Sequence, residues 1–208
     1  MSATAHPADA PLSPEAEARL HAAFWRAVAA QGWHRLTMRR LAAESGLPLS
    51  ALRRALPAPL DALRLHLRLT DQEVLRGTLP GQGGSARDRL FDVLMRRFDA
   101  LQPHRPGVLR LLRDLRRDPL LALALGPGLV ASMAWMLEAA EIGSAGPAGL
   151  LRAQGLAGVW LAALRAWEDD PTEDLAHTMA ALDRLLGRAE QVVRTLGLGD
   201  GGEGAGSA

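Results

Sequence analysis

Apolar residues recur every three or four positions through most of the chain, which is the spacing of helices that bury one face. In the first such segment, Leu20, Phe24 and Val28 share one face. Ser13 and Pro14 precede this segment and are typical of the N-cap and first turn of a helix. No segment alternates apolar and polar residues as a half-buried strand does, so the pattern predicts an all-α protein.

Two short helices are expected after the first one. Gly32 ends the first helix, Thr37 can cap the second, and Gly46 can close it in the left-handed conformation. The third helix is expected over 48–56, and Pro59 begins a fourth. Two short helices that meet at a glycine turn, with a helix on each side, form a helix-turn-helix unit.

The second half predicts longer helices. Ser85 and Asp88 follow a glycine-rich stretch at 77–84 and approximate a capping box. Asp170 and Pro171 mark the clearest helix start, as N-cap and first helical residue. After the helix that starts at Ser85, helices are expected over 105–117, 119–140, 147–168 and 171–196.

Positive charge is concentrated in one segment. Between Arg19 and Arg68 there are nine Arg and two acids, a net charge of +7, whereas 14 Arg and 16 acids follow from Gly77 onward. A confined basic patch indicates binding to a polyanion such as double-stranded DNA, and a solvated basic face is the alternative. The side chains expected to contact DNA are Thr37, Arg39, Arg40, Leu49, Ser50, Arg53 and Arg54. Ser50 and Arg54 are expected to reach base edges.

The runs HAAFWRAVAAQGW from His21 and LTMRRLAAESGLP from Leu36 resemble the DNA-binding domain of TetR-family regulators. The resemblance spans about residues 17–70 and implies that the basic unit binds DNA. The family usually has aromatic residues at the positions of Arg53 and Leu56, and a Lys at that of Pro59. Arg53 keeps a group that can bind phosphate, whereas Pro59 has no donor.

A second resemblance concerns the carboxy-terminal half. RDRLFDVLMRRFDAL from Arg87, GVWLAALRAWEDD from Gly158 and TMAALDR from Thr178 resemble ubiquinone-biosynthesis lipid-binding proteins. Those proteins share the TetR fold but present lipids. This resemblance implies an alternative function, a lipid-binding accessory protein for quinone biosynthesis that keeps the fold without binding DNA.

The run 120–137 is almost wholly apolar and is long enough to span a membrane. Gly126, Pro127 and Gly128 interrupt it, so we expect a buried, kinked helix that lines a cavity, not a transmembrane segment. An apolar small molecule or lipid is the expected effector, and core or dimer packing is the alternative role of the same side chains. The expected lining residues are Phe98, Met133, Trp135, Met136, Trp160, Leu164 and Trp167.

Small residues indicate a dimer interface. Gly155, Gly158, Ala162 and Ala166 recur at helical spacing, which lets another helix approach closely. With the last helix, they are consistent with a four-helix interface between two copies, although burial within one chain gives the same pattern.

No catalytic constellation is present. Cysteine is absent, which excludes thiolate metal sites, and the six His show no metal-ligand spacing. No glycine-rich phosphate loop occurs, so we expect no enzyme activity, no cofactor and no metal site. The first 12 residues do not resemble a secretory signal, and we expect a cytoplasmic protein.

The hypothesis is therefore a homodimeric regulator, a repressor, that binds a palindromic operator and responds to an apolar effector. The expected division of the chain is a disordered arm at 1–12, a DNA-binding domain at 13–76, a hinge loop at 77–84, a ligand-binding and dimerisation domain at 85–196, and a disordered tail at 197–208.

Overall fold

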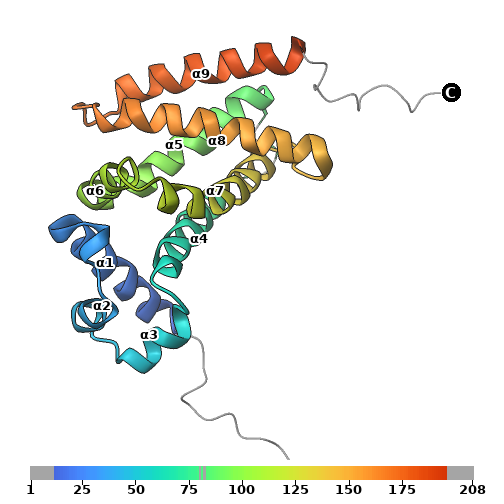
Figure 1. The fold of residues 1–208 in the computed structure, drawn as a ribbon. Helices are drawn as coiled ribbons and strands as arrows, with labels where there is room; N and C mark the ends of the chain where they lie inside the picture. Colours follow the sequence, from blue (N-terminus) through green and yellow to red (C-terminus); the bar gives the residue numbers. More distant parts are fainter. Residues whose placement is uncertain (1–11, 80, 82, 196–208) are drawn as a thin grey trace, which may run out of the picture. The chain divides into compact units, whose positions relative to one another are not determined.

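A computed structural model describes residues 12–79, 81 and 83–195 of the chain. Within these ranges the fold is all-α, which confirms the predicted fold class (Figure 1). The predicted tail, and all but the last residue of the predicted arm, lie outside the described residues. The helices are α1 (Pro14–Gln31), η2 (Trp33–Arg35), α2 (Met38–Ser45), α3 (Leu49–Ala55), α4 (Leu60–Arg76), α5 (Ala86–Leu101), η3 (Gln102–His104), α6 (Arg105–Leu115), α7 (Pro119–Ala139), α8 (Gly146–Glu168) and α9 (Ala176–Thr195).

The chain forms two compact units, and neither is continuous in sequence. Unit 1 contains residues up to Thr70 together with 100–128, and unit 2 contains 71–99 together with the residues from Leu129 onward. The division falls inside α4, α5 and α7, so each of these helices contributes to both units. This grouping differs from the linear division expected from the sequence, because a single helix can contribute residues to both compact units.

Unit 1 is built on α1, which lies against α2 and α6. The predicted face of α1 is buried through Leu20, Phe24 and Val28. The helix begins as predicted, because Ser13 Oγ accepts a hydrogen bond from the backbone N–H of Ala16 at 3.2 Å. Gly107 of α6 packs directly on α1, and a Cβ added there would lie 2.6 Å from the Trp25 ring.

Unit 2 contains the long pair α8 and α9, which run side by side (Figure 1). Its core is aromatic: the ring centroids of Phe98 and Trp160 are 4.5 Å apart, and Trp167 lies 6.2 Å from Phe98. The predicted capping box before α5 is also present, because Asp88 Oδ2 accepts from the Ser85 N–H and Asp88 N–H donates to Ser85 Oγ.

The predicted start of the last helix at Pro171 is wrong, because α9 begins at Ala176. Asp170 is buried and caps the helix from farther away, accepting from the Thr178 N–H at 2.8 Å and the Thr178 hydroxyl at 2.7 Å. The Oγ1 atom of Thr172 accepts from the Ala176 N–H at 3.1 Å, and Leu175 has a positive φ of 56°. The intervening residues therefore form turns, and the first helical turn comes after them.

The expectation that the apolar run is a buried helix is also wrong for most of its length. Helix α7 is long and apolar enough to cross a membrane, but only 28% of its most apolar window is buried. Met133 and Met136 are fully buried, whereas Leu120, Leu123 and Trp135 on other faces are mostly exposed. Because α7 is apolar on every face, its sequence pattern does not indicate which face is buried and which is exposed.

Candidate nucleic-acid interface

The turn between α2 and α3 is held by local hydrogen bonds. Thr37 Oγ1 accepts from the Arg40 N–H at 3.2 Å and caps α2 as predicted. Gly46 ends α2 with φ 68°, the left-handed conformation that glycine adopts without strain. Ser45, which is buried, donates its hydroxyl to the Leu41 carbonyl at 2.6 Å. These contacts fix the direction in which α3 leaves the turn.

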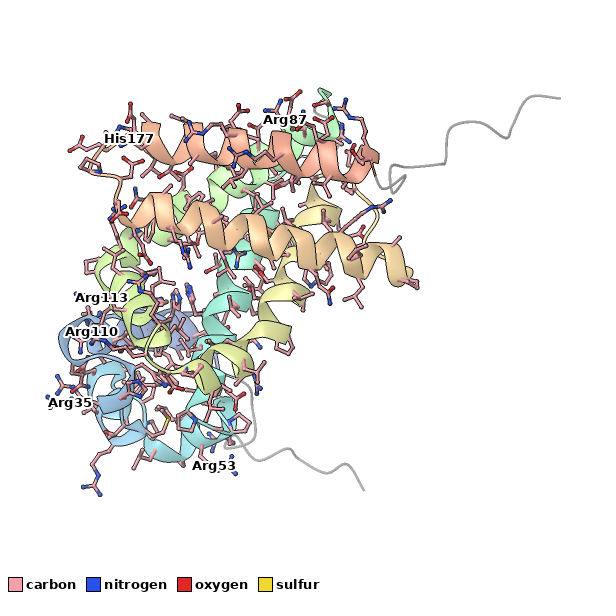
Figure 2. The ribbon with its side chains drawn as sticks, turned by 45° about the horizontal axis from the view of Figure 1, so that its top comes forward. Arg35, Arg53, Arg87, Arg110, Arg113 and His177 are labelled. Carbon is pink, nitrogen blue, oxygen red and sulfur yellow. The ribbon has the colours of Figure 1, made fainter. Side chains whose placement is uncertain are left out.

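The inner faces of α2 and α3 are apolar and the outer faces are polar. Leu41 and Leu52 are almost fully buried, and Leu56 is buried just after α3. Leu56, where the resemblance to TetR regulators leads one to expect an aromatic residue, is a core residue here. All seven predicted DNA-contacting residues are exposed, namely Thr37, Arg39, Arg40, Leu49, Ser50, Arg53 and Arg54. Arg53 projects from the end of α3 (Figure 2).

The arginines differ in their partners. Arg40 Nε donates to Glu44 Oε1 at 2.7 Å, one helical turn away. Within the part of the chain that the structure describes, Arg39, Arg53 and Arg54 form no ion pair. Three guanidinium groups on the outer faces of α2 and α3 are thus not neutralised by the protein, and such groups attract phosphate.

A contact that sequence reasoning missed fixes the turn at the end of α1. Asp114 of α6 accepts a hydrogen bond from the Trp33 N–H at 2.7 Å, and Arg110 Nε lies 3.4 Å from the same carboxylate. Gly32 lies beneath these two side chains, and a Cβ added to it would approach both at 2.8 Å. Trp33 itself is half-buried. Arg110 and Arg113 of α6 are labelled in Figure 2.

The predicted ligand-pocket residues all lie in unit 2. Phe98, Met133, Met136, Trp160, Leu164 and Trp167 are buried there, and Trp135 is 57% exposed. A cavity of about 220 Å³ in the described part of unit 2 lies elsewhere. Polar side chains, among them Asp88, Arg89 and Arg96, line this cavity.

Three solved structures share the fold. A TetR transcriptional regulator from Nitrosomonas europaea ATCC 19718 superposes with a TM-score of 0.67 at 18% identity, over 84% of this chain and 98% of that one. A TetR transcriptional regulator from Rhodococcus sp. RHA1 gives 0.54 at 15% identity, over 85% and 95% of the two chains. A TetR-family transcriptional regulator from Streptomyces coelicolor gives 0.52 at 13% identity, over 93% of each chain.

No protein-family model matches the chain, and no curated protein matches its sequence. At such low identities the structural likeness shows a TetR-like fold alone, because one fold supports several functions. The carboxy-terminal resemblance to ubiquinone-biosynthesis proteins is not shown by these structures.

Proposed function

We propose that the protein is a TetR-type DNA-binding transcriptional regulator, a repressor that acts in the cytoplasm as a homodimer. The observation that carries this proposal is the set of exposed arginines on a capped helix-turn-helix unit, three of which have no acidic partner among the described residues. The fold shared with TetR regulators supports it.

The residues of the unit divide by role in the proposed complex. Arg39, Arg40 and Arg53 bind phosphates, which sets the position of the protein without reading sequence. Helix α3 enters the major groove, where Ser50 and Arg54 contact base edges. Leu49, an exposed apolar residue at the start of α3, is suited to a thymine methyl group.

The dimer is proposed to form through α8 and α9, so that two units read a palindromic operator. Gly155, Gly158 and Ala162 of α8 are exposed, which supports close approach by a second copy. Leu150 and Leu161, also exposed on α8, add apolar area to the same helix. An apolar effector bound among the predicted pocket residues of unit 2 would favour one arrangement of the dimer and so change its affinity for DNA.

The direct test is binding of the full chain to the promoter-side DNA next to its own gene, by fluorescence anisotropy at several salt concentrations. Affinity should fall steeply as salt rises, because each neutralised phosphate releases condensed cations. Absence of salt-dependent binding would contradict the proposal.

Single substitutions of arginines test which of them contact phosphates and which contact bases. Arg53→Gln should weaken binding to all sequences and reduce the salt slope by about 1. Arg54→Gln should instead reduce the difference between operator and random DNA, by about 1–3 kcal/mol. Arg76→Gln, an exposed arginine at the end of α4 in unit 2 and outside the proposed dimer helices, is the control and should change neither quantity.

The alternative, a lipid-binding accessory protein for quinone biosynthesis, is favoured by one observation, the largely exposed apolar α7. Extraction of the purified protein followed by mass spectrometry separates the two functions. A co-purified isoprenoid lipid in a protein that does not bind DNA would support the alternative, and a lipid-free protein that binds DNA would exclude it.

A further inference from the structure

The outward face of the first half of α7 is apolar. Within 119–128, the part of α7 that belongs to unit 1, Leu120 is 77% exposed and Leu123 is 74% exposed. Ala124 and Pro127 are exposed as well, and the spacing of these four residues places them on one side of the helix, called the α7 face below. The outward face of a surface helix normally carries charged or polar residues. The α7 face is therefore suited to contact something other than water.

The opposite side of this part of α7 is fixed in the core of unit 1. Leu121 is buried, and a Cβ added to Gly128 would lie 3.4 Å from the Leu67 side chain of α4. Helix α7 also begins with a side-chain cap, because Asp118 Oδ1 accepts a hydrogen bond from the Leu121 N–H at 2.9 Å. The helix cannot span a bilayer without losing these contacts, so the α7 face is the side that is free to meet an apolar partner.

Positive charge lies at the amino-terminal end of the α7 face. Between 105 and 118 there are five Arg and two Asp, a net charge of +3. Arg117 lies three residues before Leu120, and Arg113 lies four residues before Arg117; both arginines are exposed. Arg113 projects outward from α6 (Figure 2). Neither arginine forms an ion pair with any residue that the structure describes, so both can bind the anion of a partner.

The two acidic residues of this corner already have partners of their own. Asp114 is buried, accepts from the Trp33 N–H at 2.7 Å and pairs with Arg110 at 3.4 Å. Asp118 caps α7, and its carboxylate lies 4.0 Å from the His34 ring. The exposed charge beside the α7 face is therefore mainly positive.

An anionic lipid bilayer fits both parts of this surface. Arginines bind the phosphates of lipid headgroups, and apolar side chains enter the boundary between the headgroups and the acyl chains. Double-stranded DNA would pair with the arginines but would leave Leu120 and Leu123 in water. A peptide would need a groove for these leucines, and side chains as exposed as these protrude from the surface instead of lining a groove.

We propose that the α7 face docks the protein on the surface of an anionic lipid bilayer. Leu120 and Leu123 enter the headgroup region, and Arg113 and Arg117 bind lipid phosphates beside them. The first half of α7 lies along the bilayer, as helices bound at a membrane surface do. The docking attaches the whole protein to a membrane, which differs from binding a single lipid inside unit 2, and it does not depend on DNA binding.

The test is co-sedimentation of the full chain with two kinds of vesicle, equal parts of phosphatidylglycerol and phosphatidylcholine, and phosphatidylcholine alone. Wild type should bind the anionic vesicles more tightly. Salt should weaken this binding without abolishing it, because salt screens the arginines but not the apolar contacts. Wild type that does not bind the anionic vesicles, or that binds both kinds equally, would overturn the proposal.

Paired substitutions locate the docking surface. Leu120→Gln/Leu123→Gln should weaken binding to the anionic vesicles about 100-fold, from a loss of about tenfold for each leucine. Arg117→Gln/Leu120→Gln should weaken it about 50-fold. The matched control is Arg76→Gln/Leu79→Gln in unit 2, an exposed arginine and an exposed leucine at the same spacing, and it should leave vesicle binding unchanged. An equal loss in the control would mean that docking is not specific to the α7 face.

A labelled residue reports entry into the bilayer directly. The chain contains no cysteine, so Leu123→Cys provides a single attachment point for an environment-sensitive fluorophore. Its emission should shift to shorter wavelength when anionic vesicles are added, whereas the same label on Leu79→Cys should not shift. A label on Leu123→Cys that does not respond to the vesicles would contradict insertion of the α7 face.

A second copy of the chain is the other apolar partner to be tested. The molar mass of Leu120→Gln/Leu123→Gln, measured by sedimentation equilibrium without lipid, should equal that of wild type. A lower mass would show that another copy covers these leucines, and would rule out the proposal. Without vesicles the same variant should bind DNA as wild type does. Failure of membrane docking and failure of the proposed function are therefore distinguishable.

Discussion

Each unit buries a polar cluster, but the two clusters differ in charge. Unit 1 contains a cluster of histidine and tryptophan rings linked by hydrogen bonds, in which burial disfavours a charge on His21. Unit 2 buries an ion pair, in which Arg97 donates to Asp71 and Ser132 donates to the same carboxylate at 2.6 Å. Helix α4 contributes one member to each cluster, His66 to the first and Asp71 to the second.

This difference in charge determines which change destabilises each cluster. Burial lowers the pKa of Arg97 and Asp71 raises it again, but a guanidinium stays charged throughout the pH range in which proteins fold. Its charge therefore cannot be relieved by titration, and the pair must remain complete. His21 can change its charge by taking up a proton in acid, so its cluster responds to acid instead.

The largest effect is expected from breaking the ion pair. Asp71→Ala leaves the Arg97 charge buried, under a Trp160 ring 5.2 Å away, without its carboxylate. It should lower the free energy of unfolding by about 3–5 kcal/mol, measured by urea denaturation at pH 7.5.

The control removes the whole polar set. The triple variant Asp71→Leu/Arg97→Met/Ser132→Ala has no buried charge and should recover most of the lost stability. A triple variant as unstable as Asp71→Ala would mean that packing at these positions, and not the unpaired charge, accounts for the loss.

The next effect tests how tightly the ring cluster of unit 1 is packed. Gly107→Ala puts a Cβ 2.6 Å from the Trp25 ring and 2.8 Å from the Trp25 carbonyl, which cannot turn away. We expect a loss of about 2–3 kcal/mol by thermal denaturation, and an altered Trp25 fluorescence. Gly126→Ala, in α7 of the same unit, meets nothing within 4 Å apart from its chain neighbours and should cost much less. Equal effects from the two substitutions would argue against close packing on Trp25.

The local features that the sequence predicted correctly depend on residues that lie close together in the chain. The caps at Ser13 and Thr37 and the turn at Gly46 depend on neighbours three or four positions away, and the structure has them. Helical spacing also predicted which side chains of α2 and α3 would be exposed.

Contacts over long distances in the chain could not be predicted. Asp114 and Trp33 are 81 residues apart, and nothing in either local pattern favours their pairing. Asp170 was misread for a related reason, since an N-cap signal describes a side chain three residues from its target, and this one reaches eight residues ahead.

A third prediction concerns acid. Because the pKa of His21 is lowered to about 4, the folded protein binds fewer protons than the unfolded chain below pH 6.5. The free energy of unfolding should therefore decrease by about 2 kcal/mol between pH 7.5 and pH 5, while the Arg97 pair keeps its charge. Hydrogen exchange should show amides of α1 opening before those around Arg97 in α5. Simultaneous opening of both sets would contradict a separate acid response of unit 1.

The smallest effect separates the two causes of the His21 shift. Burial is the larger cause and the charge on His104 the smaller, so His104→Gln should raise the pKa of His21 only part of the way towards 6.5. Proton NMR of the His21 ring gives the titration midpoint directly. A midpoint that returns fully to 6.5 would mean that His104, and not burial, disfavours the charge on His21. The acid sensitivity of the cluster would then arise from repulsion between its own histidines.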